Sequence, residues 1–406
     1  MMQFKSKFEN ILYQAVLRFK YAQAWLSSAL PWLTSPKERA EIILHIGAPK
    51  TGTSAIQRFC LRNRLALLRA GFYYPEHGID ENGISGGHAL ICQPGASGTI
   101  VGWELFQAWL AIAKKANLTL LLSSENFYGR ASALWPMLQD KKVKIVGWYR
   151  HPVELIVSGY NQSVKRSFWV HTLDQRCRNF LQSPNNSRLY DGHHLHEWAN
   201  FVSDAHCAFY PFVYSASQPI ETLLLEAIGL TRKQQSVFKI DGALINRSYI
   251  PDALEFKRRL NLLLTREDIE LNQMLDVFLQ AYSDKSAHAT SDAVALPAQT
   301  LQQLQQYFAQ GQTALLQRFP ALAPALLQAV DERLTHKSQA AVSMAELQHL
   351  WGRLVLAMPE TAAVLRQRLH SALEANKSAG LHEVAEVIAG EPPQAELHAA
   401  TLSERS

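Results

Sequence analysis

An apolar run that leads into a glycine loop and then into a helix constrains this chain more than any other feature. Residues Glu41–Ile46 (EIILHI) predict a buried strand, and residues 47–54 (GAPKTGTS) form the loop that follows. Beyond the loop, apolar residues recur at helical spacing to about Arg69. This order of elements points backbone N–H groups and a helix N-terminus at an anion. The sequence therefore predicts an anion-binding turn after its first strand.

Three further apolar runs predict strands. They span residues 118–123, 143–149 and 207–213, and helical patterns lie between them. Pro152, after the second of these runs, suits the first turn of a helix. Strands that alternate with helices indicate an α/β fold, a parallel sheet flanked by helices. Ligands of such sheets gather at the carboxyl ends of the strands. The glycine loop, Glu125 and Arg150 each follow a strand, so we expect them to meet at one edge of the sheet.

Composition and pattern suggest how the chain is organised. With 406 residues, of which 48% are hydrophobic, the chain can bury a full core, which excludes disordered and disulfide-stapled classes. From Asp252 onward, strand patterns give way to helical ones, the last of which predicts a helix over residues 344–373. We expect a helix within residues 1–39, an α/β domain over 40–320 and a helical extension over 321–406.

The first segment predicts an amphipathic helix. Phe4, Phe8, Ile11, Ala15 and Phe19 recur at helical spacing. Packing of this helix on its own domain is the simpler interpretation, and peripheral contact with a membrane surface or a partner stays open. Charged residues interrupt the segment, so no bilayer span or secretory signal is expected.

Cysteine usage and charge bear on compartment and partners. Four cysteines without a C-x-x-C pair predict reduced thiols. We therefore expect a cytoplasmic protein, with association at the inner face of the membrane as the alternative.

The net charge is +5, and residues 1–60 alone hold eight Lys/Arg and three Asp/Glu. This bias suits a polyanionic small molecule as well as weak nucleic-acid contact. This basic segment contains the glycine loop, so we expect its charge to serve a small anionic ligand and we expect no nucleic-acid partner.

The loop differs from the nucleoside-triphosphate loop G-x-x-x-x-G-K-[ST]. There the lysine follows the second glycine and the next hydroxyl holds Mg²⁺, whereas here Lys50 precedes Gly52. The N–H groups of Thr51, Gly52, Thr53 and Ser54 can still cradle a phosphate, and Lys50 adds a point charge. A donor with a good leaving group and no metal requirement fits this loop better than ATP does.

Two segments of the chain resemble the nucleotide-binding motifs of a known enzyme family. The segment HIGAPKTGTSAIQ resembles the 5′-phosphosulfate-binding loop of the sulfotransferases that use 3′-phosphoadenosine 5′-phosphosulfate (PAPS). The segment VGWYRHPVELIVSGYNQ resembles their 3′-phosphate element, an Arg-x-Pro with a serine eight residues after the arginine. The match covers residues 40–250, roughly half the chain, and is most similar to the bacterial, carbohydrate-acting branch.

The resemblance implies a nucleotide site and a reaction. Arg150 and Ser158 would hold the ribose 3′-phosphate, and Lys50 would stabilise charge on the leaving phosphate oxygen. Arg247 stands in an Asn-Arg-Ser segment where many members carry an Asn-x-Ser near the nucleotide. PAPS would be the co-substrate without a metal, and the acceptor a glycan or another hydroxyl-bearing molecule. Aromatic residues near the motifs, among them Tyr74 and Trp148, also favour a carbohydrate.

The acceptor hydroxyl needs a base, and two residues are candidates. His88 lies in a Gly-, Pro- and Asn-rich segment over residues 71–99 that is expected to close over the substrate. Glu125 lies at a strand end, where it serves as base, braces the loop or binds acceptor hydroxyls. The family uses histidine in some branches and glutamate in others, and we slightly favour His88. His45 precedes the loop and is expected to be a packed residue.

Two weaker patterns have ordinary interpretations. The run DGHHLH over residues 191–196 suits a helix N-terminus better than a tetrahedral metal site. The basic run Lys165, Arg166, Arg176 and Arg178 is typical of a solvated face, with contact to an anionic glycan as the alternative.

Two other functions remain as alternatives to a sulfotransferase. One is a Mg²⁺-dependent nucleotide kinase or NTPase, against which the order of Lys50 and Gly52 argues. The other is a non-catalytic nucleotide-binding subunit that assembles through its helical ends. Lys50, Arg150 and Ser158 are all present, which argues against a homologue that has lost its catalytic activity. The sequence makes no prediction of oligomeric state.

Overall fold

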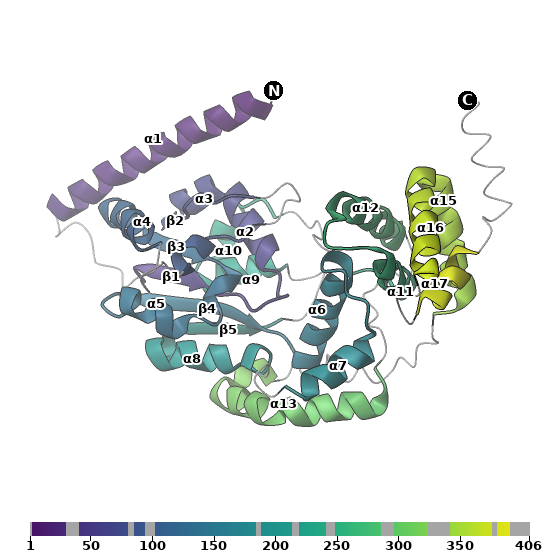
Figure 1. Cartoon of the computed structure of the whole chain (residues 1–406). Helices are drawn as coiled ribbons and strands as arrows, with labels where there is room; N and C mark the ends of the chain where they lie inside the picture. Colours follow the sequence, from purple (N-terminus) through teal and green to yellow (C-terminus); the bar gives the residue numbers. More distant parts are fainter. Residues whose placement is uncertain are drawn as a thin grey trace. The chain divides into compact units, whose positions relative to one another are not determined.

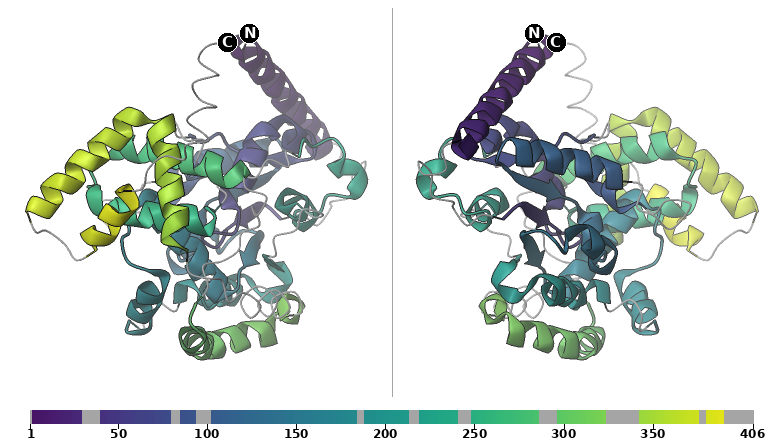
Figure 2. Two further views of the ribbon diagram at one scale, coloured as in Figure 1. Left: turned by 90° about the vertical axis from the view of Figure 1, so that its right-hand side faces the viewer. Right: turned by 90° about the vertical axis from the view of Figure 1, so that its left-hand side faces the viewer.

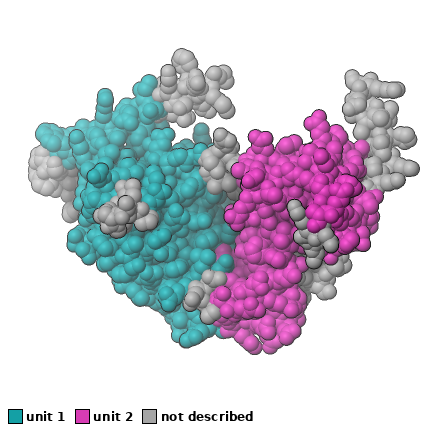
Figure 3. All heavy atoms as spheres, viewed as in Figure 1, with its two compact units in different colours: residues 1–151, 187–245, 308–327 teal, residues 152–186, 246–307, 328–406 magenta. Residues whose placement is uncertain are grey.

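The protein is described by a computed structural model that divides into two compact units (Figure 3). The structure describes residues 2–29, 40–79, 85–93, 102–183, 188–212, 219–240, 248–285, 296–323, 342–375 and 380–389. The first unit comprises residues 1–151, 187–245 and 308–327, and the second comprises residues 152–186, 246–307 and 328–406. These units cut across the three segments expected from sequence, because the chain leaves the first unit at residue 151 and returns to it twice.

A five-stranded parallel sheet forms the centre of the first unit (Figure 1). Its strands are β1 (Ile42–His45), β2 (Phe72–Tyr73), β3 (Thr119–Ser123), β4 (Val143–Tyr149) and β5 (Cys207–Pro211). They lie in the order β2-β3-β1-β4-β5, and each neighbouring pair is parallel. The α/β class and four strands were expected. The two-residue β2 was not, because it lies in the segment interpreted as a long loop.

Helices of the first unit cover the sheet. They are α1 (Met2–Ala29), α2 (Thr53–Arg62), α3 (Arg64–Arg69), α4 (Trp103–Lys115), α5 (Ala131–Leu138), α8 (His193–Val202), α9 (Ile220–Ala227) and α10 (Arg232–Gln235). Strand residues alternate between two apolar clusters, as a pleated strand requires. Ile42 and Leu44 join a cluster with α4, α5 and α8, and Ile43 joins the other with α2 and α9.

The helix expected from the loop to Arg69 is divided in two. It breaks at Asn63, between α2 and α3. The Asn63 amide donates to the carbonyl oxygens of Phe59 and Lys239 and accepts from the Lys239 N–H. These bonds to a distant backbone segment replace the continuation of the helix, which local periodicity does not reveal.

The expected N-terminal helix is present as α1, which lies beside α3 (Figures 1 and 2). Tyr13 and Leu17 are buried against the first unit. The Arg64 guanidinium carbon lies 4.6 Å from the Tyr13 ring centroid, a cation–π geometry. Among the helices described, none has a stretch long and apolar enough to cross a bilayer.

The described residues of the second unit form helices and the segments that join them. The helices are α6 (Pro152–Arg166), α7 (Leu173–Leu181), α11 (Pro251–Leu260), α12 (Ile269–Lys285), α15 (Met344–Ala357), α16 (Pro359–Glu374) and α17 (Leu381–Ile388). The chain of α13 (Ala298–Arg318) belongs to both units. One helix expected over residues 344–373 is two, because Pro359 cannot donate the hydrogen bond that would continue α15 and instead begins α16.

Candidate functional site

The strand order creates a switch point between β1 and β3. The connection from β1 runs to β2, on one side of this point, and the connection from β3 runs to β4, on the other side. In open α/β sheets, ligands bind outside the carboxyl ends of the strands at such a point. The glycine loop follows β1 and Glu125 follows β3. Arg150 follows β4, the other neighbour of β1. The candidates that follow these strands therefore share one edge of the sheet.

The loop holds three left-handed residues within six positions. Gly47 has a φ of 61°, Lys50 of 63° and Gly52 of 75°. A Cβ on Gly47 would lie 2.7 Å from Thr53 Oγ1, so only glycine fits there. A lysine in this region is uncommon and costs about 1 kcal/mol or more. The surrounding loop therefore imposes the backbone conformation of Lys50, and such strain is typical of functional turns.

Thr51 closes the loop from inside. Its hydroxyl accepts from the Ala48 N–H at 3.1 Å and donates to the Ala48 carbonyl oxygen at 2.7 Å. The side chain is completely buried. The hydroxyl is thus engaged within the turn, and any contact of Thr51 with an anion falls to its backbone N–H. Ser54, in the first turn of α2, is half-buried.

Two buried polar side chains of α2 lack hydrogen-bond partners among the described residues. Thr53 Oγ1 and both amide atoms of Gln57 have none, although the residues are only 4% and 1% exposed. Burial of unsatisfied polar atoms is costly, so such atoms call for a ligand or water. Gln57 was not singled out from the sequence. The available signal was its position one turn after Thr53, beside the apolar Ile56 and Cys60.

The two sequence motifs touch through Arg150. Its Nη1 donates to the Lys50 carbonyl oxygen at 2.8 Å, across a hundred residues of sequence. The guanidinium carbon also lies 5.2 Å from the ring centroid of Phe212, which directly follows β5. Phe212 was not anticipated, since nothing local in the sequence indicates that β5 ends beside Arg150. The contact fixes the guanidinium beside the turn that carries the Lys50 ammonium.

The described residues do not place two expected nucleotide-binding residues relative to this edge. Ser158 lies on α6, which belongs to the second unit. Pro152 begins that helix, as the sequence predicts. Arg247 lies outside the described residues. The roles of both remain predictions.

His88 is not on a lid over the site, contrary to expectation. It is 1% exposed, and its Nδ1 accepts from the Ser123 N–H at 3.0 Å while Nε2 lies 3.2 Å from the Pro75 carbonyl oxygen. Burial lowers the pKa of His88 to about 3. Both ring nitrogens of this neutral imidazole are engaged by backbone, so the geometry gives it a structural role. His45 is packed as predicted, with Nδ1 2.7 Å from Ser123 Oγ.

Glu125 is in a different position. It opens the turn η3 (Glu125–Phe127) at the carboxyl end of β3, where the residue is only partly exposed. A Cβ on Gly47 would lie 3.5 Å from its Cα, so the residue directly adjoins the loop. Partial burial raises the pKa of Glu125 above its usual value, while the positive charge of Lys50 lowers it. Of the two base candidates, Glu125 is the one at the edge where the loop lies.

The basic run after the second motif is paired within the second unit. Lys165 Nζ lies 3.6 Å and Arg166 Nη2 3.1 Å from carboxylate oxygens of Asp276. The Arg176 guanidinium stacks on Trp169, and Arg178 forms an ion pair with Asp174. These contacts engage the cations in the fold of the unit, which argues against a dedicated glycan-binding patch.

The histidine-rich run forms a helix N-terminus, as the sequence predicts. Gly192 is the N-cap of α8, and His193 begins the helix. His193, His194 and Glu197 offer ligand atoms within 4.8 Å of one another. His194 Nδ1 already lies 3.2 Å from Glu197 Oε2. This pair accounts for the position of the two side chains.

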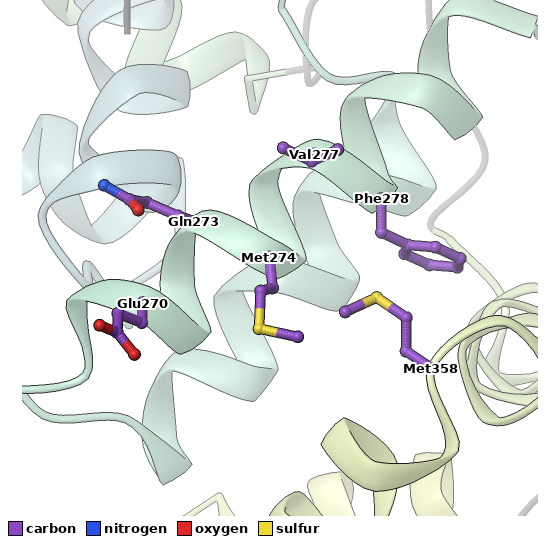
Figure 4. A pocket seen from close by; sticks show the side chains of 6 residues that line it. All are labelled: Glu270, Gln273, Met274, Val277, Phe278 and Met358. Atoms are coloured by element: carbon purple, nitrogen blue, oxygen red, sulfur yellow. The ribbon is translucent and has the colours of Figure 1, made fainter. Parts of the chain in front are cut away.

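A hollow on α12 is of a different kind (Figure 4). It has a volume of about 500 Å³. Its lining is Glu270, Gln273, Met274, Val277, Phe278 and Met358. The lining is mostly apolar, and its one charged residue is acidic. It therefore does not suit a polyanionic ligand, in contrast to the loop edge of the sheet.

We compared the chain with family models, with curated proteins and with solved structures, and none of the three comparisons gave a match.

Proposed function

We propose that this protein is a sulfotransferase of the P-loop type that transfers a sulfuryl group from PAPS to a hydroxyl acceptor. The contact between Arg150 Nη1 and the Lys50 carbonyl oxygen carries the proposal. PAPS carries negative charge at both ends of its ribose, so its site needs two cationic groups held at a fixed spacing. A guanidinium fixed beside a lysine-bearing glycine turn meets that need.

The loop offers further features that suit the phosphosulfate end of the donor. Gly47 and Gly52 give the turn its left-handed backbone, and α2 begins directly after the turn, so that its first N–H groups lie at the turn. Thr53 Oγ1, buried without a partner among the described residues, is available to hydrogen-bond a phosphate or sulfate oxygen. Ser158 and Arg247 would complete the 3′-phosphate end by resemblance.

The reaction follows from the residues at this edge. Glu125 takes the proton of the acceptor hydroxyl, whose oxygen attacks the sulfur atom in line. The new O–S bond forms as the bond from sulfur to the bridging phosphate oxygen breaks. Negative charge then develops on that phosphate oxygen, where Lys50 stabilises it. The partly buried position of Glu125 suits this role, because a raised pKa makes a carboxylate a better base.

A carbohydrate or polysaccharide is the proposed acceptor on the basis of the family resemblance. The aromatic residues named from the sequence add less than expected. Tyr74 and Trp148 are fully buried in the core and present no face to a sugar. Trp103 is 43% exposed at the start of α4. Its exposed ring is available to stack on a sugar.

The Mg²⁺-dependent kinase is the weaker candidate on a specific observation. In a nucleoside-triphosphate loop, the hydroxyl after the lysine binds Mg²⁺. Here that hydroxyl belongs to Thr51, and both its hydrogen bonds go to Ala48. Turnover of ATP that depends on Mg²⁺ and is indifferent to PAPS would support the kinase instead.

The test is transfer of ³⁵S from labelled PAPS to a panel of polysaccharides by the full chain and by Lys50→Ala. We expect the wild-type chain to label at least one polysaccharide, and Lys50→Ala to lower kcat by about 10²–10³-fold. Lys142→Ala is the matched control, because Lys142 is exposed in the same unit at the opposite end of β4.

Two results would overturn the proposal. One is normal turnover by Lys50→Ala. The other is a folded wild-type chain that fails to bind adenosine 3′,5′-bisphosphate in calorimetry. Tight binding of this nucleotide without transfer to any acceptor would instead support a non-catalytic subunit.

A further inference from the structure

The N-terminal helix α1 has two apolar faces, and the first unit uses only one of them. Tyr13 and Leu17 are buried, and Val16 and Tyr21 pack partly against the same core cluster. Four large apolar residues of the helix stay exposed, with exposed fractions between 53% and 69%. They are Ile11, Phe19, Trp25 and Leu26.

These exposed residues share one side of the helix. At about 100° per residue, they lie roughly 120° to 240° around the axis from Tyr13. Ala15 and Ala22, also exposed, fall within the same sector. The helix therefore carries an apolar face, interrupted by Arg18, on the side away from Tyr13 and Leu17. Aromatic residues on such a face suit the boundary between water and lipid.

The charge of α1 indicates what this face meets. The helix holds four basic residues, Lys5, Lys7, Arg18 and Lys20, and one acidic residue, Glu9. No acidic residue occurs from Asn10 to Ala29. An exposed apolar face on a cationic helix is complementary to a bilayer with anionic headgroups.

A second copy of the chain fits the same face less well. Arg18 is exposed and lies in the apolar sector, about 140° from Tyr13. A dimer through this face would bury Arg18, and residues 10–29 of the second copy offer no carboxylate to pair with it. At a membrane, the long arginine side chain reaches the lipid phosphates while its stem stays in the apolar layer.

We propose that the exposed face of α1 docks this protein on anionic membranes as an interfacial helix. Ile11, Phe19, Trp25 and Leu26 would enter the headgroup boundary, and Arg18 would contact lipid phosphates. The inference does not depend on the sulfotransferase proposal, because no contact given for the described side chains of α1 involves the loop edge of the sheet.

The test is co-sedimentation of the full chain with vesicles of phosphatidylcholine alone and with vesicles that also contain phosphatidylglycerol. We expect binding to the mixed vesicles that weakens with added salt. Ile11→Ser/Phe19→Ser should weaken the partition coefficient about tenfold or more, since it removes two inserted side chains. Arg18→Glu should weaken it about tenfold or more on the mixed vesicles alone.

Matched controls come from the same unit. Val237 and Ile240 are 66% and 38% exposed, and Arg232 is exposed on α10. Val237→Ser/Ile240→Ser and Arg232→Glu should bind the mixed vesicles as the wild type does. Far-ultraviolet circular dichroism checks that each variant keeps its helices.

Three outcomes would overturn the proposal: no binding to mixed vesicles, equal binding to both kinds, or equal losses in the α1 and control variants. A dimer in light scattering that Ile11→Ser/Phe19→Ser converts to a monomer, without vesicle binding, would assign the face to a second copy. Sulfate transfer to a soluble acceptor, measured on the same variants, should stay unchanged, so the two proposals fail separately.

Discussion

At the scale of single residues, environment decides which of two plausible bases suits the proposed reaction. His88 and Glu125 both follow glycine- or serine-rich sequence, but the fold buries the imidazole and leaves the carboxylate at the edge. A base must reach its substrate before its pKa matters. Position therefore favours Glu125 more firmly than its raised pKa does.

We predict that Glu125→Gln lowers kcat/KM for sulfate transfer by about 10²-fold or more. In the wild type, kcat/KM should rise with pH through a pKa above the usual glutamate value, because partial burial raises the pKa of Glu125. The variant should lose this acid limb, since an amide does not titrate. The measurement is a pH–rate profile, with Glu104→Gln on the exposed side of α4 as the control. A variant that keeps the acid limb would contradict the assignment of Glu125 as base.

At the scale of elements, the glycine turn depends on backbone shape as much as on charge. Gly47 is both left-handed and close to Thr53, so an added methyl group has no room. Gly229, after α9, is left-handed as well, with a φ of 88°, but a Cβ there meets nothing within 4 Å. Comparing substitutions at Gly47 and Gly229 therefore separates the loss of stability caused by backbone strain from the loss of function caused by a changed loop.

We predict that Gly47→Ala and Gly229→Ala both lower stability, each by about 1 kcal/mol or more of backbone strain. Only Gly47→Ala should also weaken binding of adenosine 3′,5′-bisphosphate, because it displaces Thr53 from the turn. Thermal unfolding measures the first effect and calorimetric titration the second. Equal nucleotide affinity in the two variants would show that the turn does not bind the nucleotide.

At the scale of the whole molecule, three buried histidines connect stability to pH. His45, His88 and His151 are 0%, 1% and 7% exposed. Burial lowers the pKa of His45 and His88 to about 3 and that of His151 to about 4. In the unfolded chain these imidazoles titrate near 6.5. Each one therefore takes up a proton on unfolding when the pH lies between the folded and unfolded values.

We predict that the free energy of unfolding is highest above pH 6.5 and falls as the pH drops from 6.5 toward 4. The sign follows because the unfolded state binds more protons than the folded state in this range. Melting temperature measured by circular dichroism between pH 7.5 and 4.5 checks this. Carboxylates titrate mostly below this range, so a flat profile from pH 7 to pH 5 would show that the three histidines are accessible to protons.

The sequence by itself determined the α/β class, four of the five strands, the glycine turn and the start of α6 at Pro152. These features depend on local periodicity and on the backbone preferences of glycine and proline, which short stretches of sequence carry in full. The sequence did not predict the two-residue β2 or the helix break at Asn63. Pairing with a neighbouring strand produces the first, and hydrogen bonds to a distant backbone segment produce the second.

The sequence predicted that several strand ends share one edge, but only the tertiary structure decided which strands are neighbours and which polar side chains reach that edge. The contact of Arg150 with Lys50 depends on β4 lying next to β1, and strand order is not encoded in any single strand. The burial of His88 depends on Pro75 and Ser123, which belong to other parts of the chain. Long-range packing, which no local pattern records, therefore assigned each candidate its chemical environment.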